Sequence, residues 1–491
     1  MAKRKAGSDA GARKDAKTSS VPFVRTIETD ESKDLQTQLA SGPYTDGDGV
    51  FSDILMPCSP DEFFEHTWEK MPLFISRPSL RQWYSDWLSE ESIFELLADE
   101  DSDVQYGFNL DVTAYNGEER QDFNYNSDPA EENGHVKAAL VRQRFKQQGA
   151  SLRLLHPQRY FPHLAHRMAL LEQVFGTCVG CNAYLTPPDS QGFAPHWDDI
   201  DAFILQLEGS KRWRIAKHWH KQENYLARYS SPDLASCDFS EWDDILLQPG
   251  DMLYMPRGVI HQAQAESGMS SLHLTISANQ HNTWADFLEL ALPAAVRIAS
   301  EEVLEMRESL PQHFTSYMGV MHSTDEALEI ERAAFVERAH SALDAVLQNI
   351  PFDSTADRMA ALFLRQRLPP PASVSEVDRP GNGRKLSKTS KVCLAGKDIA
   401  RLVGEDDMLV VYHCMSNDRE KHASAPSGAD DEAYSGRLEF DMDTAGTLES
   451  LLIELPFHGK GKQLSKVLPS ITEADVAVAQ RLHGAGILLV T

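Results

Sequence analysis

The sequence predicts an α+β fold around a strand-rich core, and three features of the chain support that prediction. Between 182 and 278, short apolar runs are separated by turn signals at Pro187–Ser190, Gly209–Ser210 and Pro249–Asp251. Many short strands with closely spaced turns are typical of a sandwich or barrel. From about 284 to 366 apolar residues recur instead at helical spacing, and beyond about 390 strand-like and helix-like runs alternate.

Length and composition place the chain among globular proteins. Its 491 residues suffice for two or three domains of ~100–200 residues each. No apolar run approaches the ~20 residues that span a bilayer, so we expect a soluble protein with no membrane partner. The six cysteines lack a disulfide-framework spacing, as expected in a reducing compartment, and the Cys178–Cys181 pair is interpreted as free thiols in preference to a zinc or redox site.

The formal net charge of −27 favours basic partners over nucleic acid. From Asp86 to Glu132 the chain holds fifteen acidic residues against the single cation Arg120. This segment is either a solvated acidic face or a docking surface for a basic substrate.

The N-terminal segment has the composition of a disordered tail. Residues 1–20 contain six Lys or Arg and no large apolar residue beyond Met1, so they cannot offset the entropy of ordering. We expect residues 1–42 to be disordered. The basic residues between 3 and 17 are either a nuclear localisation signal or an ordinary basic tail.

The globular part begins with a clear helix start. Ser59 has the features of an N-cap, followed by Pro60 at the first helical position and Glu62 three residues after the cap. Strands are expected at 71–77 and 151–155, and the second of these carries Arg153.

A metal site is suggested by His196 and Asp198. If this segment is a strand, residues two apart project from one face, so both side chains can bind one ion. His261, after a strand and a tight turn, is the natural third ligand. Two histidines and a carboxylate form the facial triad of non-haem Fe(II) oxygenases, which leaves positions open for a cosubstrate and dioxygen. A lone HxD triplet is usually chance, so its surroundings must decide.

The residues after this triplet strengthen the metal hypothesis. Two apolar runs flank Gly209-Ser210, which predicts a hairpin. On its second strand Lys211 shares a face with Trp213 and Ile215. An unpaired ammonium among apolar neighbours is costly, so Lys211 is expected to bind an anion.

The chain after the strand-rich core divides into three parts. Apolar residues form a helical stripe that either packs on its own chain or on a partner: Leu328, Phe335, Ala339, Ala342, Val346 and Ile350. Residues 369–390 have a linker composition. Strand 408–414, helix 446–455 and a capping box at Ser470–Glu473 then predict a small mixed domain. Residues 371–491 hold 14 basic and 18 acidic residues, which disfavours nucleic-acid binding.

The block 182–215, together with PGDMLYMPRGVIHQAQ at 249–264 and SLHLTIS at 271–277, resembles the JmjC-domain ribosomal oxygenase family, described as bifunctional lysine-specific demethylases and histidyl-hydroxylases. The resemblance covers most of the chain after about residue 45. It implies a double-stranded β-helix, the jelly roll of JmjC and cupin-like proteins. The division of the chain that follows is a tail at 1–42, a JmjC oxygenase domain at 43–283, a helical dimerisation region at 284–368, a linker at 369–390, and a winged-helix-like domain at 391–491.

The resemblance also implies ligands and roles. Fe(II) would be held by His196, Asp198 and His261, with 2-oxoglutarate and O2 as cosubstrates and Lys211 binding the far carboxylate. Asn182 is expected to assist 2-oxoglutarate, and Tyr184, Ser277 and Arg153 to face the substrate, although a structural role for each stays open. His273 and Trp197 are expected to complete the core or support the ligands. Asp199 and Asp201 are expected to be surface charges or docking groups, and His156, His163 and His166 surface or satisfied core histidines. A homodimer in the nucleus or nucleolus is expected as well.

Three functions fit these residues. The first is histidyl hydroxylation of a large-subunit ribosomal protein. The second is demethylation of methyl-lysine on histone H3, in which a hydroxylated N-methyl group leaves as formaldehyde. The third is a non-catalytic cupin-like interaction protein, which the intact triad and Lys211 disfavour. We predict an Fe(II)- and 2-oxoglutarate-dependent dioxygenase, with hydroxylation ahead of demethylation.

Overall fold

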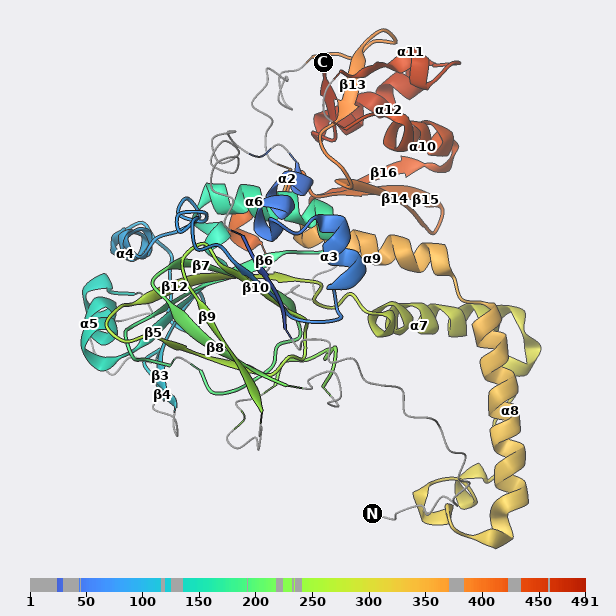
Figure 1. Cartoon of the computed structure of the whole chain (residues 1–491). Coiled ribbons are helices and arrows are strands. Elements are labelled where there is room, and N and C mark those ends of the chain that lie inside the picture. Colours follow the sequence, from blue (N-terminus) through green and yellow to red (C-terminus); the bar gives the residue numbers. More distant parts are fainter. Residues whose placement is uncertain are drawn as a thin grey trace.

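The computed structural model describes residues 24–29, 44, 46–115, 120–124, 136–191, 193–217, 224–231, 234, 241–370, 384–422, 434–457 and 460–491. A body built mainly of strands lies beside a small C-terminal domain, and the long helix α8 (Glu329–Gln348) extends away from both (Figure 1). Among these residues, no helix is long and apolar enough to cross a membrane.

The body is a jelly roll of two sheets. The large sheet has the order β1-β2-β10-β7-β12-β6-β5-β3-β4, and the small sheet the order β11-β8-β9. The strands of the large sheet are β1 (Arg25–Glu28), β2 (Leu73–Ser76), β3 (Leu110–Tyr115), β4 (Arg120–Asp122), β5 (Ser151–Leu155), β6 (Gly180–Thr186), β7 (Asp201–Glu208), β10 (Met252–Met255) and β12 (Ser271–Ala278). Those of the small sheet are β8 (Lys211–Ala216), β9 (Trp242–Leu247) and β11 (His261–Ala265).

Strand β7 is buried on both faces and separates two cores. Phe203 and Leu205 face the larger core, which the N-terminal helices cover. Ala202 and Ile204 face a second core between the two sheets, where Trp213 and Ile215 meet them. A strand covered on both sides is a continuous apolar run, as this one is.

The predicted hairpin at Gly209 is wrong. Strands β7 and β8 are consecutive but belong to different sheets, so the chain crosses from one sheet to the other at this turn. Gly209 has φ +61°, and a Cβ there would lie 1.7 Å from the carbonyl oxygen of Ser270. The glycine therefore permits both a left-handed conformation and close approach of the next segment.

Helices cover the outer face of the large sheet (Figure 1). They are α2 (Gly47–Leu55), α3 (Pro60–His66), α4 (Glu90–Ala98), α5 (Ala138–Gln148) and α6 (Pro162–Phe175). The predicted start of α3 is confirmed, because the Ser59 side chain accepts a hydrogen bond from the Glu62 amide. The tail predicted for 1–42 is wrong in one part, because β1 pairs in parallel with β2. Residues 1–23 and 30–43, including the basic cluster, lie outside the described residues.

Three long helices follow the jelly roll: α7 (Trp284–Glu302), α8 (Glu329–Gln348) and α9 (Phe352–Gln366). Part of the predicted stripe packs on its own chain, since Phe335 stacks on Phe314 at 5.7 Å between ring centroids. Val346 is buried against Ala295 and Ala299 of α7. Helix α8 otherwise exposes large apolar residues, which are Ile330, Val336, Leu343 and Leu347.

The described residues of the C-terminal domain form two three-stranded sheets and three α-helices. Its elements are β13 (Lys391–Leu394), β14 (Ala400–Glu405), β15 (Met408–His413), β16 (Arg437–Asp441), α10 (Ala445–Glu454), β17 (Lys462–Gln463), α11 (Leu464–Val467), α12 (Glu473–Gly484) and β18 (Leu488–Val490). The predicted capping box at Ser470–Glu473 is wrong by two residues. The helix begins at Glu473, so Thr472 is the N-cap. The residue at the third helical position, which completes the capping box, is therefore Asp475.

Candidate metal centre

The two histidines of the predicted triad are held together by the backbone. His196 and His261 form an isolated antiparallel bridge, with N–O distances of 3.1 and 2.9 Å. The segment 196–198 is not a strand as predicted, because β7 begins only at Asp201. Asp198 instead lies just after the bridge, where its carbonyl oxygen accepts a hydrogen bond of 2.8 Å from the Gly258 amide.

The three side chains converge on one point. One carboxylate oxygen of Asp198 lies 3.9 Å from Nε2 of His196 and 3.7 Å from Nε2 of His261. A ligand atom from each residue lies within 4.8 Å of the others. This donor set, two imidazoles and one carboxylate with an open side, fits Fe(II).

The histidine tautomers suit metal binding. Nδ1 of His196 lies 2.8 Å from the Ala194 carbonyl oxygen, and Nδ1 of His261 lies 2.9 Å from that of Val259. A carbonyl oxygen can only accept, so Nδ1 donates and the lone pair of Nε2 stays available. Burial lowers the pKa of His261 to about 4, which keeps this imidazole neutral.

Lys211 is a buried cation beside this centre. Its residue is 5% exposed, and Nζ donates a 3.0 Å hydrogen bond to Oγ1 of Thr186. Burial lowers its pKa to about 7. Within the described chain no carboxylate forms an ion pair with it, so the site has room for an anionic ligand.

Strands β6 and β12 bring the other predicted residues to the same cavity. Tyr184 lies opposite His273 in the register and their rings stack at 4.9 Å, while Asn182 lies opposite Thr275. Ser277 lies further along β12 and lines the cavity too. His273 is 2% exposed, and burial lowers its pKa well below the usual value, as suits a neutral core histidine.

Arg153 lies on β5 opposite Tyr184. Its Nε donates to Asp111 at 2.8 Å, and its guanidinium lies 5.4 Å from the ring centre of Phe193. Arg153 is thus fixed at the cavity wall by a structural ion pair, and the cavity reaches it.

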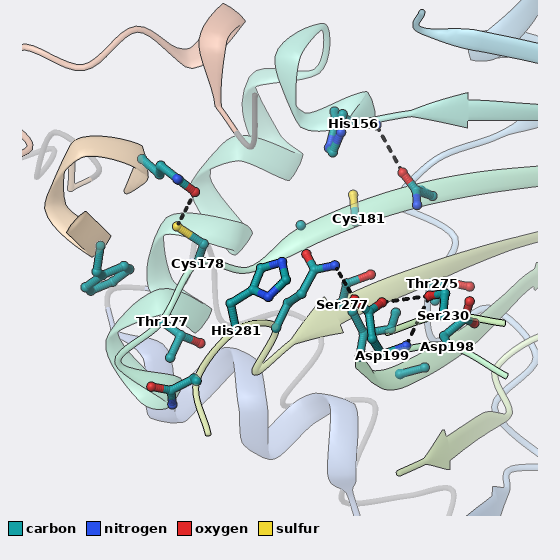
Figure 2. Close-up of a pocket in the computed structure, with 18 of the residues that line it drawn as sticks. His156, Thr177, Cys178, Cys181, Asp198, Asp199, Ser230, Thr275, Ser277 and His281 are labelled. Atoms are coloured by element: carbon teal, nitrogen blue, oxygen red, sulfur yellow. Dashed lines mark hydrogen bonds between the residues drawn. The ribbon is translucent and has the colours of Figure 1, made fainter. Parts of the chain in front are cut away.

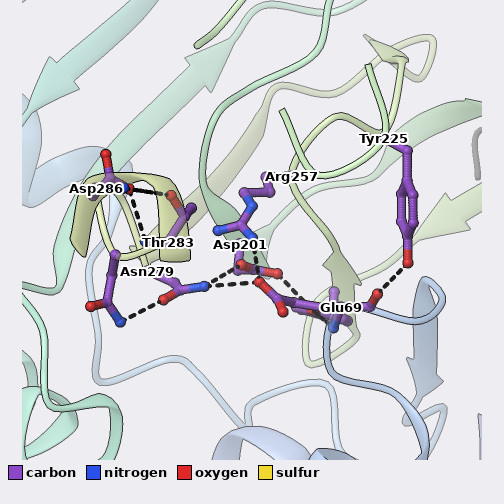
Figure 3. Close-up of polar contacts among 9 residues, drawn as sticks. Glu69, Asp201, Tyr225, Arg257, Asn279, Thr283 and Asp286 are labelled. Atoms are coloured by element: carbon purple, nitrogen blue, oxygen red, sulfur yellow. Dashed lines mark hydrogen bonds and ion pairs between the residues drawn. The ribbon is translucent and has the colours of Figure 1, made fainter. Parts of the chain in front are cut away.

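A polar network joins Glu69 to Arg257, Asn279 and Asp201 (Figure 3). Glu69 pairs with Arg257 at 2.5 Å and accepts a 3.1 Å hydrogen bond from Asn279. Its amide donates to Tyr254, whose hydroxyl donates to Asp201 at 2.7 Å. Arg257 lies four residues before His261, Asp201 lies three residues after Asp198, and Asn279 lies two residues after Ser277.

The expectation that Asp201 is a surface or docking charge is wrong. Asp201 is 0% exposed, and burial raises its pKa to about 6. Asp199 is partly exposed and accepts hydrogen bonds from Ser230 at 2.7 Å and Gln280 at 3.0 Å. The indole of Trp197 donates to the Tyr229 carbonyl oxygen at 3.1 Å and so ties the triplet to segment 224–231.

Sequence reasoning missed two residues of this site. Thr186 shares the strand face of Asn182 and Tyr184, so the period of two could have identified it. Glu69 had no such signal, because it lies in a turn at φ +52° and its partners come from distant segments.

The centre opens into one cavity of about 1360 Å³. It extends from the triad past Ser277 and His281 to Thr177 and Cys178 (Figure 2). Cys178 and Cys181 are free thiols, as predicted. His163 and His166 bond backbone carbonyls as core histidines do. His156 differs from that expectation, because it lines the cavity and its Nδ1 has no hydrogen-bond partner within the described chain.

Comparison with known proteins gives consistent matches. The JmjC domain family model matches residues 153–287. Ribosomal oxygenase 1 of Rattus norvegicus is 36% identical over 455 residues, covering 90% of this chain and 72% of that protein. The bifunctional lysine-specific demethylase and histidyl-hydroxylase NO66 of Aedes aegypti is 33% identical over 456 residues, covering 90% and 68%. The structure of the Escherichia coli ribosomal oxygenase YcfD in complex with cobalt and 2-oxoglutarate covers 88% of this chain and 97% of that one, at 14% identity and a TM-score of 0.43.

Proposed function

The chain belongs to the family of JmjC-domain ribosomal oxygenases, which depend on Fe(II) and 2-oxoglutarate, and on this premise we propose that it hydroxylates a histidine of a large-subunit ribosomal protein. The observation that carries the proposal is the triad of His196, Asp198 and His261 with the buried cation Lys211 in the same cavity.

His196, Asp198 and His261 would hold Fe(II) through two Nε2 atoms and one carboxylate oxygen. Bound there, the ion would supply, with 2-oxoglutarate, oxidising chemistry that places one oxygen atom of dioxygen in the substrate and the other in succinate, with loss of carbon dioxide. The protein supplies the fixed ligands and the position of the substrate.

Lys211 and Thr186 would bind the far carboxylate of 2-oxoglutarate. A charge-assisted hydrogen bond from Lys211 offsets the cost of its burial, and the Thr186 hydroxyl can serve as a second donor. Asn182 would assist the cosubstrate from the same strand face as Thr186. Its Oδ1 already accepts a 3.3 Å hydrogen bond from the His156 amide, which leaves its NH2 group to donate.

Tyr184, Ser277 and Arg153 would orient the substrate. Two hydroxyls can bond the two nitrogens of an imidazole, and a guanidinium bonds a backbone carbonyl, so this set suits a histidine side chain in a polypeptide. The net charge of −27 attracts a basic protein and disfavours nucleic acid as the direct ligand.

Mass spectrometry tests the proposal. Purified protein with Fe(II) and 2-oxoglutarate is incubated with large-subunit ribosomal-protein peptides and with methylated histone H3 peptides, and the His196→Ala variant is the control. We expect one oxygen atom to be added to a peptide histidine only with the unaltered protein. No change in any peptide, without substrate-stimulated 2-oxoglutarate turnover, would favour a non-catalytic interaction protein.

Demethylation of histone H3 is the second candidate, favoured by the name of the Aedes aegypti relative, which joins both activities. The two reactions share the same metal and cosubstrate. Loss of a methyl group with release of formaldehyde in the same experiment would identify it.

We also propose a homodimer formed through the α7–α8 region. Helix α8 exposes large apolar side chains, with Ile330 at 84% and Leu343 and Leu347 each at 55%. Exposed apolar residues that lie together often mark a protein–protein interface. Light scattering after size exclusion should give twice the monomer mass of 54.9 kDa, and a monomer mass would contradict this. Nuclear or nucleolar localisation is proposed from the family and the basic N-terminal segment, and a fluorescent fusion with and without residues 1–20 tests it.

A further inference from the structure

The cavity is larger than the proposed reaction needs at the metal. Its volume of about 1360 Å³ exceeds the roughly 300–1,000 Å³ that accommodates a drug-sized ligand, and 2-oxoglutarate is smaller than such a ligand. The excess lies in one arm that leads away from the triad, past Ser277 and His281 toward Thr177 (Figure 2). We call this part the distal arm.

Three separate parts of the chain form the distal arm. The jelly roll contributes Thr177, helix α9 contributes Phe363 and Gln366, and the C-terminal domain contributes Asp398 and Arg401, which bond Arg367 and Asp357 at α9. The arm therefore joins the metal centre to a domain that the proposed chemistry does not otherwise use.

The C-terminal domain is fixed in place at this arm. His422 from the C-terminal domain is buried against Glu172 of α6, with 2.9 Å between Nε2 and Oε1. Arg367, which ends α9, donates a hydrogen bond to the backbone carbonyl of Asp398. Asp398 thus has a defined position at the cavity wall.

The charges of the arm are unbalanced. Asp286 and Glu289 line it, but both pair with Arg228, and Arg401 pairs with Asp357. Asp199, at the metal end, accepts hydrogen bonds from the neutral groups of Ser230 and Gln280, and Arg367 bonds only the backbone carbonyl of Asp398, so neither carboxylate has an ion pair among the described residues. The arm therefore has an unneutralised carboxylate at each end.

The wall between these two carboxylates also has spare hydrogen-bonding capacity. Thr177 is nine-tenths buried, and its hydroxyl has no partner in the described part of the chain. A buried hydroxyl is normally bonded, so a small rotation of Thr177 that brings this unmet hydrogen bond to the backbone of a bound polypeptide would be favourable. Phe363 and Leu290 supply apolar lining beside it.

We propose that the distal arm binds a lysine- or arginine-containing segment of the substrate polypeptide that flanks the modified residue, with Asp199 and Asp398 as its anionic contacts. This inference rests on the proposed function for the identity of the substrate, but binding in the arm requires no turnover. It gives the C-terminal domain a role in recognising the substrate.

The test uses a matched pair of variants of the full chain. Asp398→Asn removes the charge at the far end of the arm, and Asp406→Asn removes one from an exposed turn of the same domain outside the cavity. Both aspartates have left-handed backbone, φ +52° and +49°, which asparagine adopts readily, so both variants should fold.

Binding is measured first with a fluorescein-labelled peptide of eight lysines, by anisotropy. We expect Asp398→Asn to weaken binding about two- to fivefold, as for one partly exposed ion pair, and Asp406→Asn to leave it unchanged. Equal weakening by both variants would mean general attraction to an acidic protein and would overturn the proposal. A benzophenone-bearing version of the peptide should cross-link to residues 356–366 or 398–401. Cross-links confined to the acidic segment 86–132 would also overturn the proposal.

Kinetics then test the link to the reaction. For a peptide that the protein hydroxylates, Asp398→Asn should raise KM by the same factor and leave kcat unchanged. Replacing the lysines and arginines of that peptide by glutamine should abolish the difference between the variant and the unaltered protein. If no peptide is hydroxylated, the proposed function fails, and the anisotropy and cross-linking results still decide on the distal arm.

Discussion

His196 and His261 exchange both backbone hydrogen bonds, although they come from different parts of the jelly roll, and their ring centres lie 4.6 Å apart. The spacing of the two imidazoles is therefore set by a two-residue ladder and not by side-chain packing. Gly258 bonds the carbonyl of Asp198 in the same region, so the three candidate ligands share one backbone framework. Such a site is arranged before any ion binds.

Replacing Asp198 by alanine should abolish turnover, because two imidazoles alone leave the charge of a divalent ion uncompensated. Titration calorimetry with Co(II) should show metal affinity reduced by more than the 10- to 100-fold that loss of a supporting contact costs. Asp199→Asn is the control for metal affinity alone, since this neighbour bonds Ser230 and Gln280 and does not belong to the triad. Full activity in Asp198→Ala would remove the metal assignment.

Lys211 should make 2-oxoglutarate binding depend on pH. Burial holds its folded pKa near 7, below its usual value, so the ammonium is present below pH 7 and is lost as pH rises above it. The KM for 2-oxoglutarate should be flat below pH 7 and then rise about tenfold per pH unit, because the anion binds the charged form. Initial rates across this range measure it.

Lys211→Arg provides the comparison, because a guanidinium stays charged throughout. Its KM should be higher at pH 7, since the larger group fits the buried site less well, but the slope above pH 7 should disappear. The same slope in both proteins would show that another group controls the pH dependence.

Local signals were the ones that sequence reasoning could use. The cap at Ser59 depends only on neighbours within three residues, and the parity of Asn182, Tyr184 and Ser277 depends only on a strand being present. The prediction of a hairpin at Gly209 was wrong because a turn between two apolar runs has the same sequence pattern whether the two strands pair with each other or enter different sheets. The expectation that Asp201 is a surface charge was wrong because alternation along a strand predicts the face on which a side chain lies, but not which residues cover that face. Here Tyr254 and Asn279 cover it.

Gly209→Ala should destabilise the fold strongly. The left-handed conformation alone costs an alanine about 1–2 kcal/mol, and the added Cβ would also meet the backbone of Ser270 at 1.7 Å. Gly268→Ala isolates the first effect, since Gly268 has φ +83° but open space around its Cβ position. Urea unfolding should show a much larger loss of unfolding free energy for Gly209→Ala, and equal losses would contradict the proposed close approach.

Glu69 should act on the metal centre through the residues that it holds. Its carboxylate faces the buried guanidinium of Arg257, four residues before His261, and Asn279, two residues after Ser277. Glu69→Ala leaves Arg257 with less compensation and should lower the unfolding free energy by about 2–3 kcal/mol, the value of a hydrogen bond to a charged group. If Glu69 has only a structural role, the unfolding free energy should fall and Co(II) affinity should stay the same.

If Glu69 also positions the centre, Co(II) affinity measured well below the melting temperature should fall about tenfold or more. Glu69→Gln, which keeps an acceptor for Arg257, should restore part of that affinity. Glu65→Gln, an exposed neighbour in α3, should change neither quantity. Unchanged metal affinity in Glu69→Ala would confine this network to stability.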